Sequence, residues 1–207
     1  MKKKLLIIGA SGHGKVVADI ALKMKNWESI AFIDDNSSVK ALMGLEVVGN
    51  SEDIPKYISD YQFFVAVGNN ATRQRIYENI KKHGGHIPVL IHPEATIGKD
   101  VHLGSGTVVM AGAIINSGTT IGKGCIINTG ATVDHDNELG DFVHISPGVN
   151  LAGTVKVGHY TWFGVGSVAS NNLSITKNCM IGAGAVVVKD INEPGTYLGV
   201  PARRILE

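Results

Sequence analysis

An apolar residue recurs at every sixth position of the chain from Ile97 to Val187, without a single interruption. Apolar residues make up 44% of the chain, so sixteen in succession by accident has odds on the order of one in a million. The sixteen positions are Ile97, Leu103, Val109, Ile115, Ile121, Ile127, Val133, Leu139, Ile145, Leu151, Val157, Phe163, Ala169, Ile175, Ile181 and Val187. A fixed short period of this kind indicates a repeat architecture rather than an ordinary sheet or helix bundle.

The residues around each sixth position indicate what one repeat looks like. A small or β-branched residue nearly always stands two positions earlier, and glycine often follows directly. Side chains two apart share one face of a strand, so both point inward, and glycine permits the bend that comes next. Three hexads then close one coil of about 18 residues, and coils stack at the strand spacing of ~4.8 Å. Sixteen hexads predict a parallel β-helix of a little over five coils.

The first 92 residues have a different rhythm, in which apolar runs alternate with amphipathic stretches. We expect strands at 4–8, 30–33, 63–67 and 86–91, and helices at 15–25 and 71–83. This order predicts a Rossmann-like α/β domain with a short parallel sheet. The sequence therefore predicts two domains, residues 1–92 and the β-helix with its closing tail at residues 93–207.

Composition excludes several classes of protein. The net charge is +1 and only 18% of residues are charged, so no basic surface for nucleic acid is expected. No segment approaches the roughly 20 apolar residues of a membrane span, and the apolar run after Lys4 is too short for a signal peptide. We expect a cytoplasmic protein without a membrane partner. Cys125 and Cys179 lie three coils apart, ~14 Å, so no disulfide and no thiol zinc site is expected.

A glycine-rich loop, Gly9-Ala10-Ser11-Gly12-His13-Gly14, follows the first expected strand and precedes a helix. Loops in this context bind phosphate at the helix N-terminus. Asp34 and Asp35 end the next strand, where an acid commonly contacts a ribose hydroxyl. Ser11 stands where the dinucleotide fingerprint has glycine, which counts against NAD. The alternative interpretation is that His13 is an exposed loop residue and Gly68 only ends a strand.

The glycine loop, Asp34-Asp35, Gly68-Asn69-Asn70, the hexads and the tail segment Gly199-Val200-Pro201-Ala202-Arg203 together resemble one family. The chain is similar to the sialic acid O-acetyltransferase family of hexapeptide-repeat acyltransferases, and most of all to the UDP-4-amino-sugar N-acetyltransferases of bacillosamine-type glycan synthesis. This resemblance implies a left-handed β-helix, acetyl-CoA as the co-substrate and a nucleotide sugar as the acceptor. It assigns the nucleotide sugar to the first domain, at Ser11, Gly12, His13, Asp34, Asp35 and Gly68.

His135 and Asp136 are the candidate catalytic residues. An adjacent carboxylate stabilises the imidazolium and raises the basicity of histidine. In the family the corresponding histidine is the proton acceptor and a glutamate follows it, so the sequence leaves open whether the shorter Asp136 reaches His135. The resemblance assigns His144 to acetyl-CoA contact, Gly153 to the thioester carbonyl as an oxyanion donor, and Val165 and Ala183 to the cofactor groove. A turn glycine is the alternative at Gly153.

The hexad count places His135 and His144 about one face of the prism apart, ~15 Å from the strand rise. Two side chains so far apart do not comfortably serve one site within one chain. We therefore expect active sites between subunits of a cyclic oligomer, which in the family is a homotrimer.

Three rival functions remain open at this point. Sialic acid or another sugar could accept acetyl on a hydroxyl group instead of an amine. A metal lyase of the carbonic-anhydrase type also uses a β-helix, but usually with two zinc-binding histidines five residues apart, a spacing that the histidines of the β-helix do not show. We expect no metal. A non-catalytic binding protein is the third, since solenoids often serve as recognition surfaces.

Overall fold

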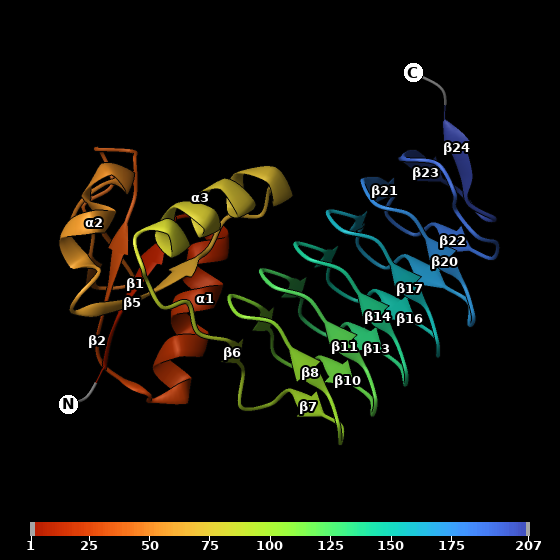
Figure 1. Ribbon diagram of the computed structural model, residues 1–207, viewed down its shortest axis with the longest axis horizontal. Helices are drawn as coiled ribbons and strands as arrows, with labels where there is room; N and C mark the ends of the chain where they lie inside the picture. The colour runs from red at the N-terminus through yellow and green to blue at the C-terminus, as the bar shows by residue number, and fades with distance from the viewer. Residues whose placement is uncertain (1–2, 206–207) are drawn as a thin grey trace. The chain divides into compact units, whose positions relative to one another are not determined.

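The computed structural model describes residues 3–205, in two compact units, Met1–Pro93 and Glu94–Glu207. The first unit is built on a parallel sheet with the strand order β2-β1-β5, flanked by helices (Figure 1). Its main elements are β1 (Lys3–Ile8), α1 (Gly12–Met24), β2 (Trp27–Ile33), β5 (Tyr61–Val65) and α3 (Asn70–Lys82). The central strand is apolar on both faces, and Leu5, Leu6 and Ile7 are fully buried, as expected for a parallel sheet. The predicted short parallel sheet is confirmed.

Two parts of the first unit differ from the sequence prediction. Short elements fill the segment between β2 and β5: β3 (Ala41–Leu42), β4 (Leu45–Glu46), the 3₁₀ helix η1 (Ser51–Asp53) and α2 (Ile54–Tyr57). They are too short to show a periodic pattern. The predicted strand at 86–91 is wrong, because the segment forms only a bridge between His86 and Gln62 and then β6 (Leu90–Ile91). Pro88 lies between these two parts and has no N–H to donate to a ladder.

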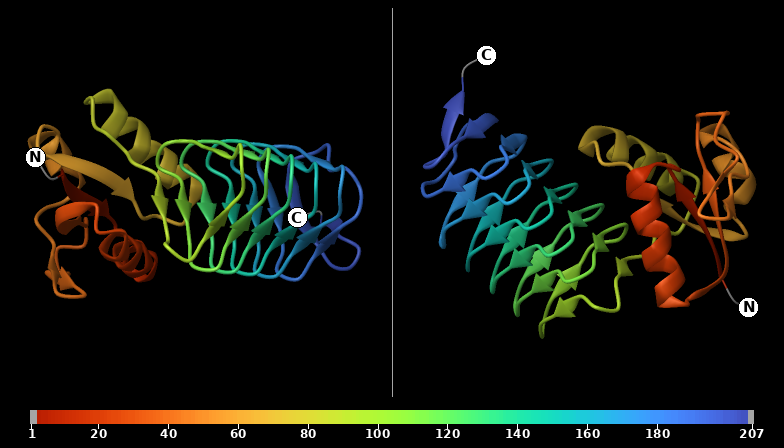
Figure 2. Two further views of the ribbon diagram at one scale, coloured as in Figure 1. Left: turned by 90° about the horizontal axis from the view of Figure 1, so that it is seen from below. Right: turned by 180° about the vertical axis from the view of Figure 1, so that it is seen from behind.

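The second unit is a parallel β-helix whose coils stack along one axis (Figure 2). Sixteen short strands, β7 to β22, form its three faces, one strand for each predicted hexad. The β13 face contains β7 (Thr96–Ile97), β10 (Ile114–Ile115), β13 (Thr132–Val133), β16 (Asn150–Leu151), β19 (Val168–Ala169) and β22 (Val186–Val187). The β14 face contains β8 (His102–Leu103), β11 (Thr120–Ile121), β14 (Glu138–Leu139), β17 (Lys156–Val157) and β20 (Ser174–Ile175).

The β15 face carries the closing tail as well as five coil strands. It contains β9 (Val108–Val109), β12 (Ile126–Ile127), β15 (His144–Ile145), β18 (Trp162–Phe163) and β21 (Cys179–Ile181), followed by β23 (Gly195–Leu198) and β24 (Arg203–Ile205). β23 pairs in parallel with β21, and β24 runs antiparallel to β23. The tail therefore extends this face beyond the last coil.

Strand register confirms the period of the coil. Thr132 pairs with Asn150, and Asn150 pairs with Val168, each eighteen residues further along the chain. From Val109 onward every hexad residue is buried, which leaves the interior of the prism filled by aliphatic side chains. Cys125 and Cys179 are buried and unbridged among them, as predicted. Among the described residues, no helix has the length and apolar character needed to cross a membrane.

Candidate active site

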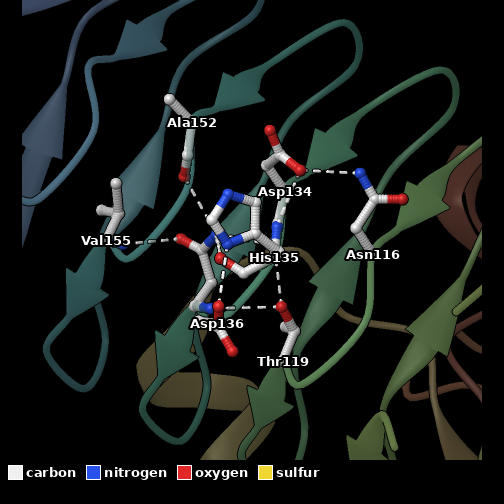
Figure 3. Close-up of polar contacts among 8 residues, drawn as sticks. Asn116, Thr119, Asp134, His135, Asp136, Ala152 and Val155 are labelled. Atoms are coloured by element: carbon white, nitrogen blue, oxygen red, sulfur yellow. Dashed lines mark hydrogen bonds and ion pairs between the residues drawn. The ribbon is translucent and has the colours of Figure 1, made fainter. Parts of the chain in front are cut away.

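His135 and Asp136 form a close pair in the turn of residues 134–137, between β13 and β14 (Figure 3). Asp136 has a left-handed backbone, with φ of 56°. On an extended strand two neighbours point to opposite faces, whereas here Asp136 Oδ2 lies 2.8 Å from His135 Nδ1. The shorter carboxylate therefore does reach the ring. We call residues 134–137 the His135 turn.

The Asp136 carboxylate changes the acid–base behaviour of the ring. Its hydrogen bond is the largest effect and raises the pKa of His135 above the usual value. Desolvation comes second and lowers this pKa, and the negative charges of Asp134 and Asp136 add smaller increases. A neutral imidazole that donates Nδ1–H to Asp136 keeps its lone pair at Nε2. The His135 side chain is 58% exposed, so Nε2 can meet a substrate.

Asp134 holds the His135 turn from the outside. Its Oδ1 accepts hydrogen bonds from the backbone N–H of His135 at 2.8 Å and from Asn116 Nδ2 at 2.7 Å. The hydrogen bond from Asn116, and then that from His135, lowers the pKa of Asp134. Sequence reasoning missed both Asp134 and Asn116, although an acid beside a candidate histidine is a signal that could have been used.

Gly153 lies one coil beyond His135, eighteen residues further along the chain. A Cβ atom at this position would stand 2.5 Å from His135 Nε2, so only glycine leaves the ring its place. The N–H of Gly153 donates to no other described residue. The structure therefore places an uncommitted backbone donor near His135 Nε2.

His144 lies on β15, in a different environment. Only 7% of its surface is exposed, and its ring stacks on Trp162 with centroids 4.8 Å apart. Its Nε2 is 3.4 Å from Asn128 Nδ2, and Trp162 donates to Ser146 Oγ at 2.8 Å. Sequence reasoning did not single out Trp162 or Asn128.

Val165 and Ala183 occupy matching positions of successive coils, in turns that lead from the β15 face to the β13 face. Both are exposed, Val165 to 57%. The predicted residues of the β-helix therefore fall into two groups. His135, Asp136 and Gly153 come together in the turns that follow the strands of the β13 face. Val165 and Ala183 lie in the turns that precede strands of that face, and His144 lies on the β15 face. One chain does not unite them.

The glycine loop of the first unit is closely packed. A Cβ at Gly14 would lie 2.0 Å from the carbonyl oxygen of Gly9, so the loop requires glycine there. Helix α1 begins at Gly12, and Ser11 is its N-cap without a capping hydrogen bond from its side chain. The Ser11 hydroxyl is thus not committed to the helix, and the predicted anion site consists of the first-turn N–H groups of α1.

The carboxylates of Asp34 and Asp35 accept hydrogen bonds from backbone N–H groups of the surrounding loops. Asp34 accepts hydrogen bonds from the N–H groups of Ala10 at 2.6 Å and Asn36 at 2.8 Å. Asp35 accepts from the N–H of Ser51 at 2.7 Å. Both line a cavity of 210 Å³ whose other walls are Asn36, Ser37, Val39, Lys40, Val47, Gly49 and Asn50. Asp34 therefore links the glycine loop to this cavity.

His13 is not an exposed loop residue. Its Nε2 is buried and has no hydrogen-bond partner among the described residues. Burial, and then the positive charge of Arg73, lowers the pKa of His13 to about 4. Arg73 is itself 1% exposed and donates to the carbonyl oxygens of Val67 and Gly68 at 3.0 and 2.9 Å. Arg73 was missed, because its place in α3 gives no sign that it turns inward.

Comparisons with known proteins agree with this architecture. Residues 4–80 match the PglD N-terminal domain, and residues 100–135 match the bacterial transferase hexapeptide (six repeats). GDP-perosamine N-acetyltransferase of Escherichia coli O157:H7 is 30% identical over 184 residues, which cover 86% of this chain and 82% of that protein. UDP-N-acetylbacillosamine N-acetyltransferase of Bacillus subtilis is 36% identical over 114 residues, 53% of this chain and 52% of the relative.

A solved structure extends the likeness to the whole chain. The acetyltransferase domain of PglB from Neisseria gonorrhoeae FA1090, in complex with acetyl coenzyme A, has a TM-score of 0.96 and 40% identity, and the match covers 99% of this chain and 100% of that one. The fold and the turn histidine define a hexapeptide-repeat acyltransferase. Within this class, the chain belongs to the PglD-type family of nucleotide-sugar N-acetyltransferases.

Proposed function

We propose that this protein transfers the acetyl group of acetyl-CoA to the 4-amino group of a nucleotide-activated 4-amino-4,6-dideoxy sugar. The observation that carries the proposal is the His135–Asp136 pair, with Nδ1 held at 2.8 Å from the carboxylate and Nε2 left available. The names of the two relatives support an amine on a nucleotide sugar as the acceptor, with GDP in one and UDP in the other. The resemblance in sequence favours UDP.

The reaction is a direct attack without a covalent enzyme intermediate. The sugar amine forms a bond to the acetyl carbon, His135 Nε2 accepts the amine proton, and the carbon–sulfur bond breaks to release CoA as the thiolate. The Gly153 N–H donates to the oxyanion of the tetrahedral intermediate, a contribution worth up to ~10² to 10³ in rate for such groups. Cys125 and Cys179 are buried and do not act as nucleophiles.

The first unit holds the nucleotide sugar in this proposal. The first-turn N–H groups of α1 and the side chains of Ser11 and His13 face the diphosphate and sugar, while Asp34 and Asp35 border the cavity for the nucleoside. The low pKa of His13 keeps its ring neutral at neutral pH, so the ring adds no charge beside the diphosphate. Gly68 is held in place by Arg73.

The acetyl-CoA site lies between subunits of a cytoplasmic homotrimer. His135, Asp136 and Gly153 come from one chain, and His144, Val165 and Ala183 line the pantetheine groove from its neighbour. The separation of these two groups within one chain supports this arrangement, because a site that needs both is incomplete without a second copy.

The test is thiol release from acetyl-CoA, with the product identified by mass spectrometry. The acceptor panel contains UDP- and GDP-linked 4-amino-4,6-dideoxy sugars, and free and CMP-linked sialic acid. We expect rapid release with one of the amino sugars and a product heavier by one acetyl group on nitrogen. Acetylation of sialic acid alone would instead favour the O-acetyltransferase, and no turnover with any acceptor together with no binding of acetyl-CoA would favour the non-catalytic protein.

A further inference from the structure

Asn137 is a polar residue in the interior of the prism, where apolar and threonine side chains otherwise dominate. It occupies the small inward position of its hexad and has no exposed surface. The equivalent positions of the same column are Val101, Thr119, Val155 and Leu173. A buried amide is costly unless its hydrogen bonds are made. The partners of Asn137 therefore show what it does.

Two of these hydrogen bonds are not special to asparagine. Asn137 donates to the carbonyl oxygen of Ala152 at 3.0 Å and accepts from the N–H of Val155 at 3.2 Å. Thr107 makes the same pair of bonds, to the residues fifteen and eighteen positions further on. Thr119 and Thr161 repeat it. We call this pair of bonds the coil stitch, and threonine is sufficient for it.

The two remaining bonds are what asparagine adds. Its Nδ2 also donates to the carbonyl oxygens of Asp134 at 2.7 Å and His135 at 3.3 Å, so its two N–H groups serve three acceptors and one of them is shared. These carbonyls belong to the peptide planes before and after the α-carbon of His135. Fixing both planes fixes the two backbone dihedrals of His135, and with them the direction of its side chain.

The His135 turn is therefore clamped from both sides. Outside the prism, the Asp134 carboxylate accepts the His135 N–H, as the labelled residues of Figure 3 show. Inside it, Thr119 donates to the Asp134 carbonyl at 2.8 Å, beside the bond from Asn137. The neighbouring Asp136 has the left-handed backbone that recurs at every sixth residue from Asp100 to Gly184, so this conformation belongs to the coil and the hydrogen bonds are what distinguish the His135 turn.

We propose that Asn137 is a positioning residue for the transferase reaction, which holds the His135–Asp136 pair in its productive geometry from inside the β-helix. The proposal rests on the proposed role of His135 as the base. Asn137 itself touches neither substrate nor the reacting atoms. It acts through the backbone of the turn that carries the imidazole.

Three variants separate this role from general stability. Asn137→Thr keeps the coil stitch and loses the two bonds to the His135 turn. Asn137→Val loses both, and valine fits because Val155 occupies the next coil of the column and Val101 lies two coils before. Thr107→Val removes a coil stitch at a turn that carries no candidate catalytic residue, and is the matched control.

The readouts are kcat, the KM for acetyl-CoA, the thermal midpoint, and the pKa of the His135 ring from NMR titration of labelled histidine. For Asn137→Thr we expect a thermal midpoint near that of the wild type, an unchanged KM and a kcat lower by up to about 100-fold, the cost of a small misplacement of a reacting group. The pKa of His135 should fall toward that of free imidazole, as the ring loses Asp136 while Asp134 remains nearby. Thr107→Val should lower the thermal midpoint and leave kcat and the ring titration unchanged.

The outcomes distinguish this inference from the proposed function. If Asn137→Thr retains the wild-type kcat and the wild-type titration of His135, then Asn137 contributes only the coil stitch and the inference is wrong. If His135→Ala retains wild-type turnover, the proposed function fails instead. The NMR titration then still decides whether Asn137 positions the ring.

Discussion

Gly153 faces the edge of the His135 ring that carries Nε2, and a Cβ atom there would stand 2.5 Å from that nitrogen. We predict that Gly153→Ala displaces the imidazole and lowers kcat by about 10- to 100-fold. The atoms that would meet the new methyl group belong to a half-exposed side chain, so the thermal midpoint should change little. Steady-state kinetics and thermal unfolding check both parts.

A double-mutant cycle shows whether Gly153 acts through the ring. If the alanine acts by displacing His135, the Gly153→Ala change should cost nothing further in a His135→Ala background. An equal loss in both backgrounds would mean that the new methyl group acts independently of the imidazole.

Asp136→Asn tests the effect of the carboxylate on the base. The hydrogen bond to Asp136 raises the pKa of His135, and the base works only when unprotonated, so activity falls as the pH drops through that pKa. The amide removes the charge, which lowers the pKa. The acid limb of kcat/KM should therefore move to lower pH, and the maximal rate should fall because the base is weaker.

The control for this variant is Asp100→Asn. Asp100 is also left-handed, with φ of 57°, but follows Lys99 instead of a histidine. Its pH profile should match that of the wild type. An acid limb that stays in place in Asp136→Asn would remove the carboxylate from the acid–base chemistry.

His13 should couple folding of the first unit to pH. Its pKa is lowered to about 4 in the folded protein, against about 6.5 in the unfolded chain. Between these two values the unfolded state binds more protons, so stability falls as the pH drops through this window. From about pH 7.5 to about pH 5 the loss from this residue is about 2 kcal/mol.

Hydrogen exchange of the buried β1 amides, corrected for the intrinsic effect of pH, measures this loss. His13→Gln should reduce it by about that amount, and the exposed His83→Gln should not. The same loss in His13→Gln as in the wild type would show that the ring is protonated without cost in the folded state.

The sequence predicts the β-helix in more detail than the site. Each hexad fixes one strand, so the period from Ile97 to Val187 predicts all sixteen. The first unit is harder to predict from the sequence. Its two-residue strands follow no period, and Pro88 interrupts a run that is otherwise apolar. Within the site, spacing identifies His135 and Gly153 as stacked one coil apart.

Other features of the site depend on tertiary contacts that spacing does not encode. The left-handed backbone of Asp136 follows the hexad period, since it recurs at every sixth residue from Asp100 to Gly184, but the contact of its carboxylate with the ring depends on how the two side chains lie. Arg73 looks like a surface residue of an amphipathic helix until the fold buries it. Asn137 does leave a trace, since it is an amide at a position where the hexads otherwise have a small or apolar residue.

Mixed oligomers test whether the site is shared between subunits. In a cyclic trimer whose sites take His135 from one chain and His144 from the next, co-expression of His135→Ala and His144→Ala chains restores both residues in about one quarter of the sites. We expect activity near that fraction, although each variant alone is nearly inactive. No recovery, or an active monomer by light scattering, would place the whole site within one chain.

Turnover of His135→Ala with the best nucleotide amino sugar, at saturating acetyl-CoA, tests the central claim most directly. General-base catalysis by this imidazole predicts a fall in kcat of about 10² to 10⁴ with little change in the thermal midpoint. Wild-type turnover in this variant would contradict the account.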